Sequence, residues 1–137
     1  DASKSRGLGD VYKRQILGTF FANYIFGLNV IEISSNMRSG TNIYISEIFA
    51  AIGLLLVILL SRTDGKNIVA FNVGIYITAA IIFTSSASFA NPAVTIARVF
   101  TESFAGINPS TVIFFISCQV IGMFAAYLLY NQFFKSK

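Results

Sequence analysis

Apolar residues gather along this chain in four long stretches, separated by segments that hold most of the polar positions. The stretches are Ile16–Ile31, Ile43–Leu60, Ile68–Phe83 and Val112–Phe134. A helix that crosses a lipid bilayer needs about 20 residues, with a range of roughly 17 to 25. The first and third stretches reach that length only with flanking residues. The pattern predicts an all-α membrane protein with four transmembrane helices.

The segment between the third and fourth stretches, Thr84–Thr111, is long, moderately apolar and contains the sequence Asn91-Pro92-Ala93. Asn is a favoured N-cap and Pro suits the first helical position, so a helix is predicted to begin at this pair. From Pro92 to about Glu102 it would be about 16 Å long, about half the thickness of the hydrocarbon layer. Backbone that is not helical is tolerated at membrane depth only where protein buries it or it lines a water-filled cavity. We therefore predict a re-entrant half-helix in addition to the four spans.

The composition supports a membrane protein and argues against several other classes. Hydrophobic residues make up 55% of the chain and charged residues 12%, and the chain has no His and a single Cys. These residues provide no catalytic constellation and no metal-ligand set, so we expect no enzyme activity, no catalytic residue, no metal and no cofactor. Cys118 is interpreted as a small packing residue. The formal net charge of +4 is scattered along the chain, which does not favour a nucleic-acid partner.

The distribution of charged residues also distinguishes the first 15 residues from the rest of the chain and indicates how the chain is oriented in the membrane. Residues 1–15 have a soluble composition and are expected to be a non-native or disordered leader. Arg62 and Lys66 lie between the second and third stretches, and Lys135 and Lys137 follow the fourth. If the long connection re-enters without crossing, all four lie on one side of the membrane. The positive-inside rule then places the C-terminus in the cytoplasm.

These features together resemble the second half of a major intrinsic protein, the aquaporin and aquaglyceroporin family. The resemblance is carried by the Asn-Pro-Ala motif and the small-residue loop before it, by Glu47, and by Gln119-x-x-Gly122 in the fourth stretch. It implies a bundle of six spans and two half-helices that meet at the midplane, assembled as a homotetramer in a bacterial inner membrane. Residues 16–137 would supply spans three to six and the second half-helix, as a truncated fragment of such a channel domain.

The resemblance also implies a pore and its narrowest point, the constriction. The residues that it assigns to them are Asn91, Pro92, Ala93, Ala79, Ser88 and Val94. The Asn91 amide would donate a hydrogen bond to a passing solute, and the positive end of the half-helix would disfavour cations and protons. Val94 stands where the family usually has Arg, so the constriction should be wider and more apolar than a water-specific one. The implied function is a passive channel for water and small uncharged solutes such as glycerol, urea or arsenous acid.

Two charged residues within the implied channel need their own interpretation. By the resemblance, Glu47 accepts hydrogen bonds from the backbone of the re-entrant loop and supports the pore. A proton relay is the alternative, but the chain offers no His and no second intramembrane acid as its next member. Arg98 lies four residues before Glu102, and opposite charges at this spacing pair on a helix face. We expect that pair, or a position of Arg98 in the vestibule.

Two other functions stay open at this point. One is a secondary transporter with a broken helix, since such helices also direct their N-termini at midplane substrates. Ion coupling normally requires carboxylates near the site, and Glu47 is the only acid within a span. The other is a fragment that conducts nothing. Gly18, Gly53 and Gly122 are expected to let spans pack closely.

Overall fold

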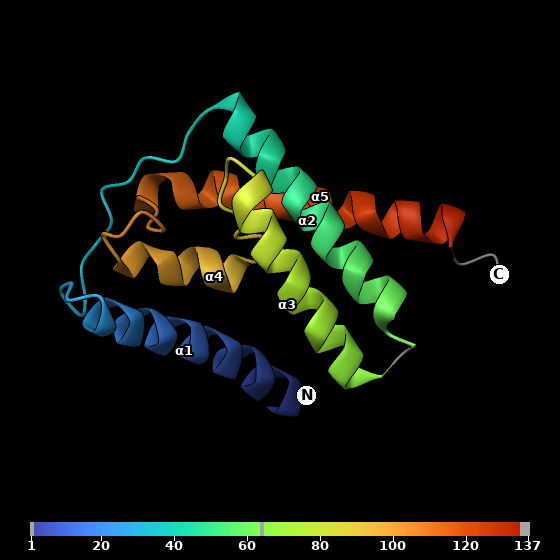
Figure 1. The fold of residues 1–137 in the computed structure, drawn as a ribbon, viewed down its shortest axis with the longest axis horizontal. Helices are drawn as coiled ribbons and strands as arrows, with labels where there is room; N and C mark the ends of the chain where they lie inside the picture. Colours follow the sequence, from blue (N-terminus) through green and yellow to red (C-terminus); the bar gives the residue numbers. More distant parts are fainter. Residues whose placement is uncertain (1, 64, 135–137) are drawn as a thin grey trace. The chain divides into compact units, whose positions relative to one another are not determined.

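The computed structural model describes residues 2–63 and 65–134, and all regular structure in them is helical (Figure 1). The elements are α1 (Ala2–Ile25), α2 (Thr41–Ser61), α3 (Lys66–Phe83), α4 (Pro92–Ala97), the 3-10 turn η1 (Arg98–Phe100) and α5 (Pro109–Phe133). By length and composition, α2, α3 and α5 are apolar enough to cross a membrane. The all-α membrane fold class is thereby confirmed.

The first predicted span differs from the prediction at both ends. The helix α1 begins at Ala2, within the expected leader, and ends at Ile25 instead of Ile31. Its N-terminal half carries charged residues, so α1 is not among the helices that are apolar enough to span. Whether residues 1–15 are native to the protein stays a prediction, and Asp1 lies outside the described residues.

A Schellman motif stops α1 six residues early. Gly27 has a φ of +68°, a left-handed conformation that glycine adopts without steric cost. Its N–H donates to the Tyr24 carbonyl at 3.2 Å, and the Leu28 N–H donates to the Asn23 carbonyl at 2.9 Å. These are the two hydrogen bonds that define the motif. The apolar residues after Ile25 therefore form a turn instead of continuing the helix.

The chain divides into two compact units. Unit 1 contains the described residues of Asp1–Arg38 and Asn91–Ile113, and unit 2 those of Ser39–Ala90 and Phe114–Lys137. In unit 1, α1 runs alongside α4 (Figure 1). Asn23 of α1, which is 2% exposed, joins this helix to η1, because its amide nitrogen donates to the Phe100 carbonyl at 2.9 Å.

The connection between α1 and α2 is also fixed within unit 1. The Ser34 N–H donates to the Val99 carbonyl at 2.8 Å, and the Asn36 side chain donates to the Ser103 carbonyl at 2.7 Å. The guanidinium of Arg38 donates to the Gly106 carbonyl at 2.7 Å. We call residues 26–38 the clamped loop, because these bonds attach it to a segment more than 60 positions later in the chain.

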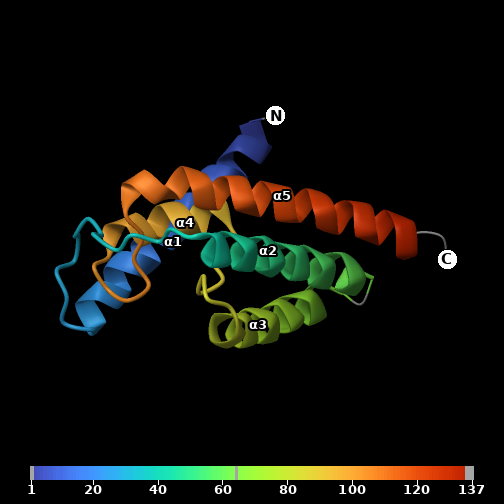
Figure 2. The same cartoon turned by 90° about the horizontal axis from the view of Figure 1, so that it is seen from above.

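In unit 2, α2 and α3 form an antiparallel hairpin (Figure 2). The Tyr76 hydroxyl donates to the Ala50 carbonyl at 2.9 Å and occupies the space that a Cβ on Gly53 would fill. On α5, a Cβ added to Gly122 would lie 2.5 Å from the Ile48 carbonyl oxygen. Close packing is confirmed for these two glycines. It is wrong for Gly18, where no heavy atom of the described residues lies within 4 Å of an added Cβ.

The helix α5 begins three residues before the predicted stretch. Asn108 precedes Pro109, and its side-chain oxygen accepts a hydrogen bond from the Ser110 N–H at 3.0 Å. Asn-Pro therefore starts a helix twice in this chain. Lys135 and Lys137, which carry part of the orientation argument, lie outside the described residues.

Candidate pore loop and half-helix

The loop that precedes the Asn-Pro-Ala motif has an unusual backbone. Ala87, Ser88 and Ala90 have φ values of +62°, +47° and +48°. The left-handed conformation costs an L-residue with a Cβ roughly 1 to 2 kcal/mol. Three such residues within four positions persist only where the surroundings hold them in place.

Glu47 provides that restraint in unit 2. Its side chain is fully buried, and Oε1 accepts hydrogen bonds from the Ala90 N–H at 2.6 Å and from the Gln119 side-chain nitrogen at 2.7 Å. The other oxygen, Oε2, has no hydrogen-bond partner among the described residues. The backbone contact expected of Glu47 is therefore present, whereas the role of Glu47 in supporting a pore stays a prediction.

Gln119 was singled out in the sequence only as part of a family motif. The structure buries it completely and makes it the second donor to Glu47. A buried amide in an otherwise apolar helix needs a hydrogen-bond partner, because leaving it unsatisfied is costly. That requirement was the available signal, but sequence alone did not identify Glu47 as the partner.

The half-helix begins in unit 1 as the sequence predicts. Asn91 has extended backbone angles, and its side-chain oxygen accepts a hydrogen bond from the Ala93 N–H at 2.8 Å. Pro92 is the first helical residue, and the Asn91 carbonyl accepts from the Thr95 N–H at 3.0 Å. No hydrogen bond of the Asn91 side-chain nitrogen is found within the described residues, and the residue is half-exposed. The side-chain oxygen of Asn91 therefore caps the helix, and the side-chain nitrogen can still donate a hydrogen bond.

The helical segment is shorter than predicted. It ends at Phe100, two residues before Glu102, and its last turn has 3-10 geometry. Thr101 is extended, and its hydroxyl donates to the buried side-chain oxygen of Asn23 at 2.5 Å. This bond draws the chain away from the helical path.

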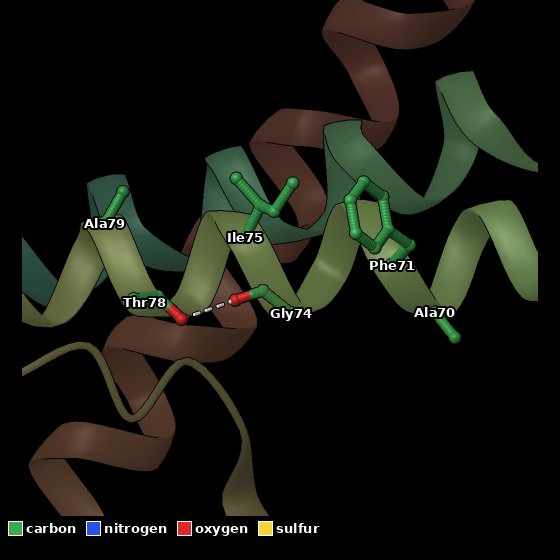
Figure 3. Close-up of a pocket in the computed structure, with 6 residues that line it drawn as sticks. All are labelled: Ala70, Phe71, Gly74, Ile75, Thr78 and Ala79. Carbon is green, nitrogen blue, oxygen red and sulfur yellow. Dashed lines mark hydrogen bonds between the residues drawn. The ribbon is translucent and has the colours of Figure 1, made fainter.

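The three positions predicted to form the constriction lie in different settings. Ala79 is exposed on α3, where it shares one side of the helix with Ile75 and Phe71 (Figure 3). A shallow depression runs there, lined by Ala70, Phe71, Gly74, Ile75, Thr78 and Ala79. The Thr78 hydroxyl donates to the Gly74 carbonyl at 2.8 Å, so the only side-chain hydroxyl of this lining is engaged within the helix. The depression is therefore an apolar surface.

Ser88 and Val94 are less exposed than Ala79. Ser88 is buried in unit 2, and its hydroxyl has no hydrogen-bond partner among the described residues. Val94 is half-buried on α4 in unit 1. Each of the three positions thus carries a small or medium-sized uncharged side chain.

The predicted ion pair between Arg98 and Glu102 is wrong. The Glu102 carboxylate accepts hydrogen bonds from the backbone N–H of Ser35, at 2.6 Å, and from the Ser35 hydroxyl. Because helical geometry ends at Phe100, the spacing of four no longer puts the two charges on one helix face. Arg98 instead lines a cavity of about 600 Å³ in unit 1.

A comparison with known proteins gives this geometry a family. The chain is 41% identical over 114 residues to the aquaglyceroporin AqpS of Rhizobium meliloti (strain 1021), which covers 83% of the chain and 49% of that protein. The chain belongs to the major intrinsic protein family. It spans about half the length of the curated relative that it matches. No family model matches the chain, and no solved structure gives a significant match.

As a member of this family, the chain is an integral membrane protein, in agreement with the three long apolar helices among its described residues. The strained loop, the buried Glu47 and the capped half-helix are local features of this major intrinsic protein. They give a physical reason for each residue that carried the resemblance.

Proposed function

We propose that the protein is a passive channel for water and small uncharged solutes, with Asn91 as a hydrogen-bond donor in its pore. The observation that carries this proposal is that the oxygen and the nitrogen of the Asn91 amide have different roles. Its oxygen is fixed by the Ala93 N–H, whereas its nitrogen is left to donate. A fixed donor of this kind can bind a water or a hydroxyl group and release it without a covalent step. The similarity to an aquaglyceroporin supports the same conclusion.

We further propose that the solutes include glycerol, urea or metalloid acids such as arsenous acid. Ala79, Ser88 and Val94 provide no cation and no imidazole, so nothing charged narrows this part of the path. An apolar and wider constriction lowers the cost of passing a solute larger than water. The apolar depression beside Ala79 is compatible with such a path.

The proposal extends to the assembly. We propose that residues beyond this chain complete the pore. We also propose that the whole protein forms a homotetramer in a bacterial inner membrane, with its C-terminus in the cytoplasm. Arg62, which follows α2, and Lys66, the first residue of α3, support that orientation. Arg62 lies 5.4 Å from the centre of the Tyr130 ring, a cation–π contact that groups a cation and an aromatic residue as at membrane interfaces.

The test is a swelling assay on vesicles that contain the full-length protein. Flux of water, glycerol, urea and arsenous acid is measured for the wild type and for Asn91→Asp. Asp caps a helix about as well as Asn, so the fold is retained. The variant lacks the donor and adds a negative charge, so we expect flux to fall about tenfold or more, as for the loss of a single good hydrogen bond to a solute.

Asn108→Asp is the matched control, because Asn108 caps α5 through the same Asn-Pro sequence. It should leave flux unchanged. Equal loss in both variants would show that helix capping, and not donation to a solute, explains the effect. Water flux without glycerol, urea or arsenous acid flux would reject the proposed solutes, and the absence of all flux would reject the channel.

A further inference from the structure

The cavity in unit 1 has a single charged group in its lining. It lies between the last turns of α1, the first residues of the clamped loop and the segment around η1. Residues that line it include Ala22, Asn23, Phe26, Arg98, Thr101 and Phe104. Its volume, about 600 Å³, is within the range of small-molecule sites.

Arg98 lines this cavity, and no anion from the described residues balances its charge. Among the described residues, no ion pair or side-chain hydrogen bond of Arg98 is found, and Glu102 is bound to Ser35. A guanidinium stays charged at any physiological pH. Cations held within a membrane protein almost always pair with an anion or another polar group. The cavity is therefore expected to receive an anion.

Most of the other polar side chains around Arg98 already donate to protein acceptors. The Asn23 amide nitrogen donates to the Val30 and Phe100 carbonyls, and its oxygen accepts from Thr101. The Thr19 hydroxyl donates to the Gln15 carbonyl at 3.0 Å. Arg98 is thus the principal donor available to a ligand in the described part of this cavity.

Two aromatic side chains in the lining are strongly exposed. Phe26 is 80% exposed and Phe104 is 82% exposed, and both line the same cavity as Arg98. A small inorganic anion would leave these rings uncovered. An anion that carries a hydrocarbon chain would pair with Arg98 and cover the rings at once.

We propose that this cavity binds an anionic phospholipid, with the phosphodiester on Arg98 and an acyl chain on Phe26 and Phe104. Arg suits a phosphate group because its planar guanidinium can donate two parallel hydrogen bonds. The site is separate from the Asn91 donor, so it does not rest on the proposed permeation.

The test uses native mass spectrometry of the full-length protein in detergent, with phosphatidylglycerol or phosphatidylcholine added. We expect phosphatidylglycerol to bind more tightly than phosphatidylcholine. Arg98→Gln should weaken phosphatidylglycerol binding about tenfold, the scale of one hydrogen bond to a charged group. Arg98→Lys should retain much of the affinity, because it keeps the charge. Arg62→Gln, a matched change at an arginine of unit 2 that stacks on Tyr130, should have no effect.

Two further arms distinguish the lipid from other anions. The Phe26→Ala, Phe104→Ala double variant should weaken phosphatidylglycerol binding, whereas inorganic phosphate at millimolar concentration should not displace the lipid. Displacement by phosphate would overturn the lipid assignment in favour of a free anion site. Equal binding to the wild type and Arg98→Gln would overturn the site itself. Thermal unfolding provides a second readout, because phosphatidylglycerol should raise the melting temperature of the wild type and not that of Arg98→Gln.

Discussion

Glu47 shows, at the scale of one residue, how a single oxygen restrains a strained loop. Its Oε1 holds the Ala90 N–H and the Gln119 amide together, and Ala90 is one of the left-handed residues. Removing the acceptor would leave the buried Ala90 N–H unsatisfied and would take one hydrogen bond from the Gln119 amide. A buried donor that is left unsatisfied lowers the free energy of unfolding by about 1 to 3 kcal/mol.

We therefore expect Glu47→Ala to lower the free energy of unfolding by several kcal/mol and to speed hydrogen exchange at the Ala90 amide. Glu47→Gln keeps an oxygen acceptor at the same place and should cost less than half as much. Chemical unfolding in detergent and amide exchange measure the two effects. If Glu47→Ala left exchange at Ala90 unchanged, the restraint would have to come from elsewhere in the loop.

Glu102 gives a pH dependence to the clamped loop. Hydrogen bonds from the Ser35 side chain and backbone lower the pKa of the Glu102 carboxyl from its usual 4.5. A folded-state pKa below the unfolded one contributes stability that is complete above the unfolded value. That contribution is lost as the pH falls through the folded value.

The melting temperature of the wild type should therefore exceed that of Glu102→Gln at neutral pH, and the difference should shrink as the pH falls below about 4.5. Ser35→Ala removes the side-chain donor. Its own melting temperature should therefore fall less than that of the wild type as the pH falls through the same range. A difference between wild type and Glu102→Gln that stays constant from neutral to acid pH would contradict this role of the carboxylate.

At the scale of helices, glycines mark where α5 and α2 approach each other in unit 2. A Cβ on Gly122 would lie 2.5 Å from the Ile48 carbonyl oxygen and 2.8 Å from the Ala51 Cβ. Backbone cannot move aside as a flexible side chain can. Gly122→Ala should therefore destabilise the protein by about 1 to 3 kcal/mol, the usual cost of overpacking.

Gly74→Ala is the matched control, because Gly74 is also helical and nothing in the described residues lies within 4 Å of an added Cβ. It should be neutral or stabilising by about 0.5 to 1 kcal/mol, since alanine favours a helix over glycine. Thermal unfolding of both variants decides the comparison. Equal destabilisation would show that the effect follows from helix propensity and not from close packing.

The sequence predicted α2 and α3 to within two residues at each end, because long apolar stretches bounded by polar residues leave little choice of element. It missed the end of α1, where apolar residues continue beyond Gly27 although the backbone turns there. It also missed that Asn108-Pro109 starts α5, although the same pair had predicted the start of α4. In both places a local signal was present, a glycine for the helix end and an Asn-Pro pair for the helix start. The apolar residues around each signal outweighed it in the prediction.

For the site, the residues themselves predicted the Asn91 cap, and the family resemblance implied the backbone contact of Glu47. Neither identified the partners that come from tertiary structure. Gln119 meets Glu47 across 72 positions, and Ser35 meets Glu102 across 67. No local pattern reports such pairings. The error at Arg98 has the same origin, because a tertiary contact of Thr101 ended the helix on which the ion pair depended.

For the whole molecule, Val94 provides the sharpest test of the proposed solute range. Val94→Arg places a long cation beside the Asn91 donor and should narrow the path. We expect glycerol and arsenous acid flux to fall at least tenfold, about 1.4 kcal/mol of added barrier, with a smaller loss for water. Val94→Leu, which enlarges the side chain without charge, is the control. Equal loss of all solutes in Val94→Arg would argue against a constriction at this position.

The pairing of distant segments in unit 1 has a consequence for how the protein is made. Asn23 and its partner Thr101 are 78 positions apart, and all of α2 and α3 is synthesised between them. At about 5 to 20 residues per second, a ribosome takes about 4 to 16 s to bridge that interval. Throughout it, the polar groups of the clamped loop and of Asn23 have not yet met their partners. Unit 1 is therefore a late product of translation, and a ribosome that stalls before residue 101 leaves α1 without the contacts that secure it.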